Sequence, residues 1–289
     1  MYSPDILWPS FLNGLTTGAI YALVALGLTL IYGVLHIINF AHGAALMMAL
    51  YGVYYLFTRF GVDPYLALPV MVPAMFVAGY FLYRWIIGRA SAGRDENILL
   101  VTLGVAIVLE NLALLFFTSD TRTIDTDYTL TTVNLLGAMI STPKVIAMAG
   151  ALVTAALLWI LMTRTSLGRA IRACAKERHG ARLVGIDVER VFALSFGIGL
   201  ACLGAAACFL MPIYYVNPTV GGGFVLIAFT IVVLGGMGSF GGALLGGLLI
   251  GVVESLGGLM LGESLGQIGI FAIFIAVLLF RPQGIFGRT

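Results

Sequence analysis

RTSLGRAIRACAKERHGARLVGIDVER, residues 164–190, is a basic connection between two long apolar segments. It holds seven of the fifteen Lys and Arg residues of the chain. The segments on either side are long enough to cross a bilayer, and positively charged connections stay on the cytoplasmic side. We therefore interpret residues 164–190 as a structured cytoplasmic surface that meets a soluble partner. The alternative is that this loop only fixes the topology.

The basic loop also carries a helical pattern. Ser166 is placed to cap a helix over residues 167–178, and Gly185 suits the end of a second, short helix. Asp187 is placed to cap the helix that follows. One apolar stripe with helical spacing consists of Leu167, Ile171 and Cys174. The loop is thus predicted to be an amphipathic helix pair whose stripe inserts into a cleft on the partner.

The composition indicates an all-α polytopic membrane protein. Of the 289 residues, 61% are hydrophobic and only 10% are charged, whereas about 25% are charged in a soluble domain. The net charge of +2 gives no reason to expect a nucleic-acid partner. Three cysteines do not suggest a disulfide framework, and residues 1–10 lack the basic start of a signal peptide. We expect residues 1–289 to form a single transmembrane domain in contact with lipid.

The apolar segments predict about nine membrane crossings, with eight to ten allowed by ambiguous breaks. Residues 84–96, 164–190 and 281–289 carry twelve Lys and Arg, and the opposite side carries three. The positive-inside rule then places the N-terminus outside and the C-terminus in the cytoplasm. Residues 118–142 become an external, acidic connection.

Two apolar stretches are interrupted by residues that a lipid-facing helix does not favour. The first, residues 33–43, contains His36, Asn39 and His42, and the second is the glycine cluster at residues 235–242. Such segments fit broken or re-entrant helices that line a protein-enclosed cavity. The two stretches share a weak internal similarity, so we expect both breaks to line a pathway near the bilayer midplane, between two repeated halves or at an interface with a second subunit.

Two carboxylates, Glu110 and Glu254, lie inside predicted spans. A charged group at the bilayer centre costs at least ~2.5 kcal/mol, so both should face the bundle interior or water. Contact with a solute and pairing with neighbours remain open alternatives. His36 and His42 have no third ligand at useful spacing, so neither a metal nor any other cofactor is expected. The candidate path residues are His36, Asn39, His42, Glu110, Gly236, Gly238 and Glu254.

Small residues recur every fourth position near the end of the chain, in the rows Gly238, Gly242, Gly246 and Gly247, Gly251, Ser255. Each row places small residues on one helix face, which lets two membrane helices approach closely. Gly236, Gly238 and Gly241 match a dinucleotide-binding fingerprint, but their membrane-apolar flanks argue against that function.

Four ordered stretches resemble the inner-membrane permease subunits of ABC importers for branched-chain amino acids, the LivH type. They are NGLTTGAIYALVALGLTLIYGVLHIINFAHG (13–43), GRAIRACAKERHGARLVGI (168–186), VVLGGMGSFGGALLGGLLIGVVE (232–254) and LLFRPQGIFG (278–287). The resemblance runs nearly end to end. It implies a bacterial-type inner membrane location, a second homologous permease subunit, two cytoplasmic ATPase subunits and an extracytoplasmic solute-binding protein.

The resemblance also implies that residues 168–187 dock on an ATPase. The chain has no phosphate-binding loop, so it is not expected to be an enzyme and must obtain energy from partners. A stand-alone secondary transporter driven through Glu110 or Glu254 and a passive channel are the rival functions. Branched-chain amino acids lead among the solutes, with other amino acids, urea or short amides and aromatic acids left open. The predicted coupling residues are Leu167, Arg169, Ile171, Arg172, Ala181, Gly185, Ile186 and Asp187.

Overall fold

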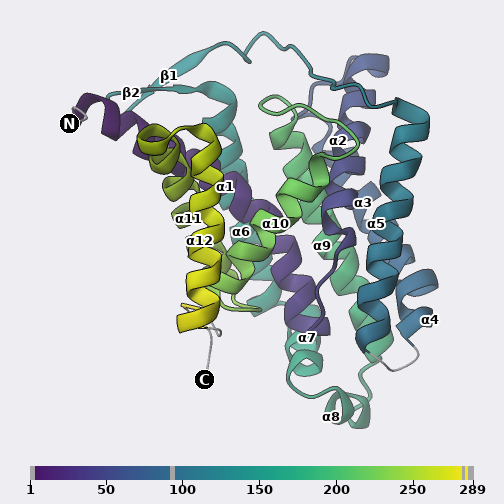
Figure 1. Ribbon diagram of the computed structural model, residues 1–289. Coiled ribbons are helices and arrows are strands. Elements are labelled where there is room, and N and C mark those ends of the chain that lie inside the picture. Colours follow the sequence, from purple (N-terminus) through teal and green to yellow (C-terminus); the bar gives the residue numbers. More distant parts are fainter. Residues whose placement is uncertain (1–3, 92–94, 282–283, 286–289) are drawn as a thin grey trace.

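A computed structural model describes residues 4–91, 95–281 and 284–285, and it is almost entirely helical (Figure 1). The first helix, α1 (Pro4–Leu35), runs obliquely through the centre of the bundle and is buried along most of its length. Its most extensive helix contacts are with α6 (Thr142–Arg164), α9 (Val188–Leu210), α10 (Val220–Gly235) and α11 (Phe240–Leu261). A helix that is apolar on all sides needs such a surround of other helices.

The remaining helices pack around these. The second helix, α2 (Ala41–Phe60), is also buried over its first half and packs on α9, α10 and α5 (Asp95–Phe117). The third, α3 (Leu68–Leu82), packs on α9 and continues through a π-turn, η1 (Tyr83–Ile87), into α4 (Gly88–Ser91). The last helix, α12 (Glu263–Phe280), lies against α11 and α10. Much of the apolar surface of α5 and α6 remains exposed, as expected for helices that face lipid.

Six helices in the described part are long and apolar enough to cross a membrane: α1, α3 with its continuation, α5, α6, α9 and α11. The 16 residues of α10 span only about 24 Å, less than the ~30 Å hydrocarbon core. A mostly helical architecture with several membrane-length helices is therefore confirmed, while the count of nine crossings depends on α2, α10 and α12 and stays a prediction.

The most extensive helix contact, α1 with α11, is built from small residues. Gly14 and Gly18 of α1 lie directly against the backbone of α11, and an added Cβ on Gly14 would be 2.7 Å from the Cα of Val252. Gly247 of α11 in turn approaches Ala22 of α1, and a Cβ added to Gly247 would be 2.7 Å from the Cα of Ala22. The row of Gly247, Gly251 and Ser255 thus packs as predicted, while Gly242 and Gly246 face α10. The small-residue row on α1 was not anticipated.

A β-hairpin is the one sheet in the described structure, and the sequence did not predict it. Its strands, β1 (Thr132–Leu135) and β2 (Ala138–Ser141), pair antiparallel with Leu135 opposite Ala138. Leu136 and Gly137 form the turn with φ of 52° and 89°, the two positive values that a tight hairpin requires. The polar connection over residues 118–142 is therefore partly ordered, and Trp8 Nε1 of α1 donates a 2.9 Å bond to the Leu136 carbonyl.

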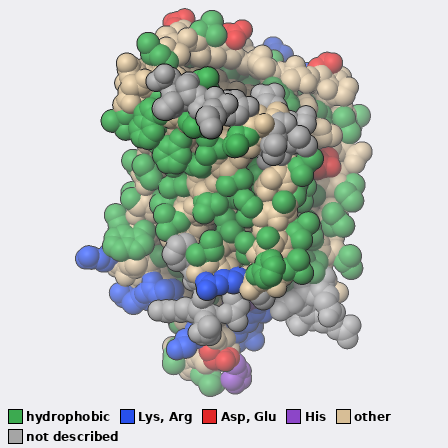
Figure 2. Space-filling view, turned by 60° about the vertical axis from the view of Figure 1, so that its left-hand side comes forward, with side chains coloured by type: hydrophobic (Ala, Val, Ile, Leu, Met, Phe, Trp, Pro, Cys, Tyr) green, Lys and Arg blue, Asp and Glu red, His purple; other side chains and the backbone are tan. Residues whose placement is uncertain are grey.

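Charge separates the two ends of the molecule. In Figure 2, Lys and Arg side chains gather below a broad hydrophobic band, and acidic side chains appear at the opposite end. The basic end carries α7 (Ser166–Lys176) and α8 (Arg178–Leu183), which protrude from the bundle in Figure 1. The hairpin lies at the other end (Figure 1).

Candidate functional site

The first break separates α1 from α2. His36 ends α1 with φ of 58°, a left-handed conformation uncommon for a residue with a side chain. The connection then runs back alongside α1 before α2 begins (Figure 1). Asn39 Oδ1 accepts a 3.1 Å bond from the amide of Ala41, and His42 Nε2 donates to the Val24 carbonyl at 3.0 Å. The start of α2 therefore lies well inside the protein.

Two polar atoms at this break have no protein partner. Asn39 is 2% exposed and His42 is fully buried, and Asn39 Nδ2 and His42 Nδ1 make no hydrogen bond within the described structure. Buried polar groups are nearly always satisfied by protein, water or ligand. The predicted polar lining at Asn39 and His42 thus lies in the interior, whereas the side chain of His36 is exposed.

The second break, between α10 and α11, depends on glycine residues with positive φ. Gly236 and Gly238 have φ of 89° and 86°, and the Ser239 hydroxyl caps α11 by accepting a 3.1 Å bond from the Gly242 amide. Gly238 lies against Gly33 near the end of α1 and lines a cavity of about 220 Å³ together with Arg172 of α7. This break is therefore at the basic end of the molecule, beside the loop helices, a placement that argues against the predicted midplane position of Gly236 and Gly238.

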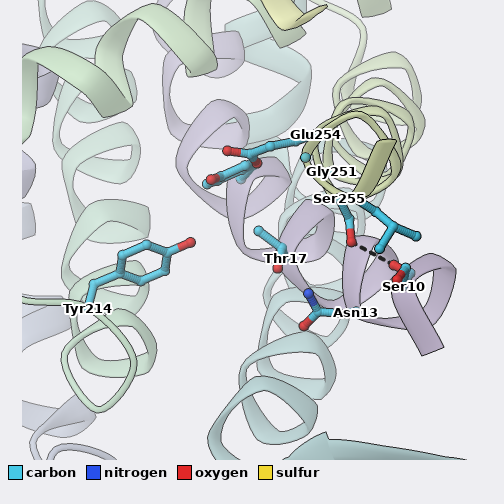
Figure 3. A pocket seen from close by; sticks show the side chains of 10 residues that line it. Ser10, Asn13, Thr17, Tyr214, Gly251, Glu254 and Ser255 are labelled. Carbon is cyan, nitrogen blue, oxygen red and sulfur yellow. Dashed lines mark hydrogen bonds between the residues drawn. The ribbon is translucent and has the colours of Figure 1, made fainter. Parts of the chain in front are cut away.

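A polar cavity of about 680 Å³ opens between α1, α11 and the connection that follows α9. Side chains from three elements point into it (Figure 3): Tyr214 lies across from Glu254, and Thr17 and Asn13 of α1 line the cavity beside them. Ser255 donates a 2.7 Å hydrogen bond to the Ser10 carbonyl, which ties α11 to α1 at the edge of the cavity. The lining residues are Ser10, Asn13, Thr17, Tyr21, Tyr214, Gly251, Glu254, Ser255, Gly258 and Leu259.

Two opposite charges flank this cavity. Glu254 Oε2 is shielded from solvent and has no hydrogen-bond partner in the described structure. Lys144, at the start of α6, donates a 2.8 Å bond to Asn13 Oδ1 and interacts with Glu254 at longer range. Tyr21 interacts with both Glu254 and Tyr214. The cavity is thus polar, with the carboxylate of Glu254 in its lining and the ammonium group of Lys144 beside it.

The basic loop has the predicted two-helix form with different caps. The Thr165 hydroxyl, rather than Ser166, accepts the Gly168 amide at 3.0 Å and caps α7. That helix ends at Lys176, before the predicted Arg178, because the Glu177 carboxylate caps α8 through the His179 amide at 3.1 Å. A hydroxyl one residue earlier reaches the free amides of the first turn equally well.

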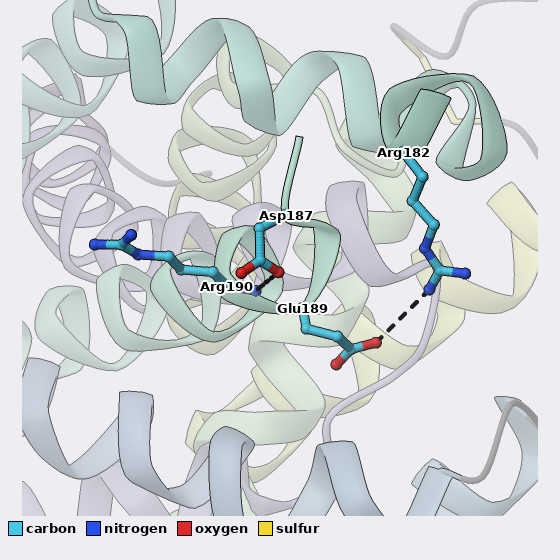
Figure 4. A network of polar contacts seen from close by, with 4 residues as sticks. All are labelled: Arg182, Asp187, Glu189 and Arg190. Carbon is cyan, nitrogen blue, oxygen red and sulfur yellow. Dashed lines mark hydrogen bonds and ion pairs between the residues drawn. The ribbon is translucent and has the colours of Figure 1, made fainter. Parts of the chain in front are cut away.

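The end of α8 and the start of α9 agree with the prediction. Gly185 has φ of 85°, and the amides of Gly185 and Ile186 donate 3.0 Å bonds to the carbonyls of Arg182 and Ala181. This pair of bonds defines a Schellman ending. Asp187 accepts a 3.1 Å bond from the Arg190 amide, and Arg182 lies 3.8 Å from Glu189 (Figure 4). The turn is therefore held from both sides.

The apolar stripe of the loop faces the protein itself. Ile171 is 1% exposed, Cys174 is fully buried and Ala181 is 4% exposed, all against the chain's own core. The predicted insertion of this stripe into a partner cleft is therefore wrong, since a helix at the bundle surface buries its apolar face locally first. The exposed apolar residues of the loop are Leu183 and Val184, at 76% and 75%.

Arg178 connects this loop to the first break. Its Nη2 donates a 2.6 Å bond to the carbonyl of Leu35, the last residue of α1, and its guanidinium lies 5.2 Å from the ring centre of Phe192 in α9. A cation at a helix C-terminus satisfies a free carbonyl and interacts favourably with the helix dipole. A movement of α8 is thereby linked to the end of α1.

Residues 10–278 match the family described as the permease component of branched-chain amino acid transport systems. The chain belongs to this permease family. It is 36% identical to the high-affinity branched-chain amino acid permease BraD of Pseudomonas aeruginosa, over 96% of this chain and 94% of BraD. It is 34% identical to LivH of Escherichia coli K12, again over 96% of this chain and 94% of the relative.

A solved structure shares the fold of this branched-chain amino acid permease family member. It is PsaBC from Streptococcus pneumoniae in complex with Fab, with a TM-score of 0.52 at 16% sequence identity. The similarity covers 95% of this chain and 93% of the solved one. At this identity the likeness concerns the arrangement of helices alone.

The permease brings some of the predicted path residues together and separates others. Asn39 and His42 share the first break, Gly236 and Gly238 share the second, and Glu254 lies in the polar cavity. Glu110 is half-buried on α5, an outer helix whose long-helix neighbour is α2. The sequence reasoning missed Asn13, Tyr21, Lys144 and Tyr214. A signal was present for α1, where Ser10, Asn13, Thr17 and Tyr21 recur at helical spacing inside an apolar span.

Proposed function

We propose that this chain is a permease subunit of an ATP-driven importer for branched-chain or closely related amino acids. It would act with a second homologous permease subunit, two cytoplasmic ATPase subunits and an extracytoplasmic solute-binding protein, in a bacterial-type inner membrane. The observation that carries the proposal is the basic two-helix loop tied by Arg178 to the end of α1, in a chain of this permease family. A stand-alone secondary transporter does not need such a loop.

The translocation path in this proposal follows the polar groups in the interior. Asn39 and His42 offer buried, unpartnered nitrogen atoms beside α1, and Glu254 offers a carboxylate in the polar cavity. Gly236 and Gly238, both with positive φ, would allow the backbone between α10 and α11 to act as a hinge at the basic end. Polar and irregular backbone at membrane depth is tolerated where it lines such a cavity. Glu110 lies apart from these groups, and we leave it out of the path.

Coupling in this proposal uses the exposed part of the loop. Leu183 and Val184 present an apolar tip next to the turn at Gly185, and Arg169 and Arg172 present charge nearby. Leu167 and Ile186 support the tip from half-buried positions, while Ile171 and Ala181 anchor it to the bundle. ATPase closure would move the tip, and Arg178 would pass that movement to α1.

The test is ATP-dependent uptake by a reconstituted complex. Proteoliposomes with both permease subunits, the ATPases and loaded binding protein should accumulate L-leucine when ATP is supplied at the basic side. Leu183→Asp should abolish uptake together with stimulated ATP hydrolysis, while Leu130→Asp, at an exposed apolar position on the opposite connection, serves as the control. Uptake driven by an ion gradient in the absence of the ATPases would establish the secondary transporter instead.

The orientation is tested by cysteine labelling. All three native cysteines are buried, so single cysteines introduced at the exposed Leu130 and Leu183 stand out against a low background. With the N-terminus outside and the C-terminus inside, an impermeant maleimide reaches position 130 in intact cells and position 183 only after lysis. The reverse pattern would contradict the topology. The two chain ends themselves lie outside the described residues.

A further inference from the structure

We propose that the polar cavity between α1 and α11 recognises the zwitterionic head group of a free amino acid. In this arrangement Glu254 receives the ammonium group and Lys144 receives the carboxylate. The inference rests on the proposed function for its biological meaning, and it adds a binding site to a path that was so far described only as polar.

The carboxylate of Glu254 is the first reason. Its Oε2 is inaccessible to solvent yet accepts no hydrogen bond, although the side chain borders an open cavity. A carboxylate with a buried oxygen that lacks a full set of donors is costly. An ammonium group in the cavity would supply three donors to Glu254 and to the neighbouring hydroxyls of Tyr21 and Tyr214.

Lys144 is the second reason. Its ammonium group donates to Asn13, which itself lines the cavity, and the structure contains no direct ion pair between Lys144 and Glu254. An ammonium has three donors, so Lys144 retains capacity for a carboxylate after bonding to Asn13. Lys144 thus lies next to Asn13 at the border of the cavity and is not paired directly with Glu254, so each charge can meet one end of a zwitterion.

The size and the remaining lining of the cavity fit a small aliphatic amino acid. Its volume of about 680 Å³ falls within the ~300–1,000 Å³ of ordinary small-molecule sites. Gly251 and Gly258 contribute no side chains, and Leu259 and the ring of Tyr214 provide apolar surface. A branched hydrocarbon side chain has room there while its charged groups meet Lys144 and Glu254.

The competing explanation is that Lys144 and Glu254 only neutralise each other within the bundle. In that case, removal of one charge would leave the other uncompensated, and removal of both would restore the protein. For a zwitterion site, removal of both charges would be at least as harmful to binding as removal of either one. The double variant therefore separates the two explanations.

The experiment measures binding of tritiated L-leucine to the purified, complete transporter complex without the binding protein. 3-Methylbutylamine, which lacks the carboxylate, and 4-methylpentanoate, which lacks the ammonium group, serve as competitors. We expect each to compete at least tenfold more weakly than leucine. Glu254→Gln and Lys144→Met should each weaken leucine binding by roughly 10- to 100-fold, the factor for a lost charge-assisted hydrogen bond, and the double variant should not recover.

Glu110→Gln, which neutralises a carboxylate in an outer helix, should leave leucine binding unchanged. Tyr21→Phe is a milder probe that keeps the ring and should weaken binding roughly three- to tenfold, so the inference remains testable if a charge variant fails to assemble. Recovery in the double variant, or equal competition by all three compounds, would overturn the site. A wild-type complex whose ATP hydrolysis responds to loaded binding protein but which binds no leucine at millimolar concentration would also overturn it, with the proposed function intact. Absence of that ATPase response would contradict the proposed function instead.

Discussion

The two helix breaks of this permease reach a similar backbone outcome with different residues. At the first, His36 adopts φ of 58° despite its side chain, and the buried Asn39 and His42 hold the following turn by hydrogen bonds. At the second, Gly236 and Gly238 adopt φ near 90° at little steric cost, and one Ser239 cap follows. The first break is specified by side chains and suits recognition, whereas the second is specified by backbone freedom and suits movement.

The largest loss of stability is expected from a substitution at Gly43, where the start of α2, just after the first break, packs against α10. A Cβ on Gly43 would collide with the Gly221 carbonyl group and lie 3.0 Å from the Cβ of Val225. Gly43→Ala should therefore destabilise the protein by about 3 kcal/mol and sharply lower the yield of monodisperse permease. Gly222→Ala, where the added Cβ meets open space, should stabilise α10 by up to ~1 kcal/mol. Wild-type yield and melting temperature for Gly43→Ala would contradict this close approach.

Because His36 is strained in its left-handed conformation and glycine is not, substitutions at the two breaks should change the free energy of unfolding in opposite directions. Gly238→Ala should lower the free energy of unfolding by about 1–2 kcal/mol because alanine pays the left-handed penalty that glycine avoids. His36→Gly should raise it by up to ~1 kcal/mol, since the left-handed strain is released and the exposed imidazole loses only an edge contact with the ring of Tyr32. Thermal unfolding of the purified complex measures both. Two shifts of the same sign would show that φ does not control these positions.

Arg178 links the basic loop to the first break, so its substitution should reduce the coupling of ATP hydrolysis to uptake more than it reduces stability. Arg178→Gln removes the bond to the Leu35 carbonyl and should cost about 1–2 kcal/mol, with a disproportionate loss of ATP-driven uptake. Arg182→Gln removes only the exposed pair with Glu189 and should cost under about 1 kcal/mol. Uptake per hydrolysed ATP is the measurement. An unchanged ratio in Arg178→Gln would mean that the loop acts on the bundle by another route.

The smallest stability change is expected at Asn39. Asn39→Ala loses the bond to the Ala41 amide, worth about 1 kcal/mol, but it also removes an unpartnered buried amide nitrogen, so the net change should stay below ~1 kcal/mol. Leucine uptake should nevertheless fall severalfold if this nitrogen faces the path. Uptake at the wild-type rate would assign Asn39 to packing alone.

Local features were predictable from the sequence where a single segment determines them. The cap at Asp187, the left-handed Gly185 and both helix breaks follow from residue types within a few positions of each other. The packing row on α11 was also visible, because glycine spacing on one helix defines a face. Its partner on α1 was not deduced, since more than two hundred residues separate the two helices.

Features that depend on tertiary placement were predicted less well. The stripe of Ile171 and Cys174 was recognised as apolar, but an amphipathic pattern does not say whether its apolar face meets its own chain or another. Glu254 was recognised as embedded, yet its cavity needs Lys144 from α6 and Tyr214 from the connection after α9. The position of Gly238 beside α7 was not deduced, because similarity between two stretches of sequence does not fix where each lies along the bundle.

The glycine seam between α1 and α11 has a consequence for biosynthesis. The first helix leaves the ribosome early, but the helix that covers its small-residue face is completed more than two hundred residues later. At about 5–20 residues per second, that interval lasts roughly ten to fifty seconds. During this time α11 is absent, so the face of α1 that carries Gly14 and Gly18 contacts lipid or the insertion machinery instead. A nascent chain that stops before α11 therefore exposes an unfinished seam, which gives membrane quality control a structural mark of incompleteness.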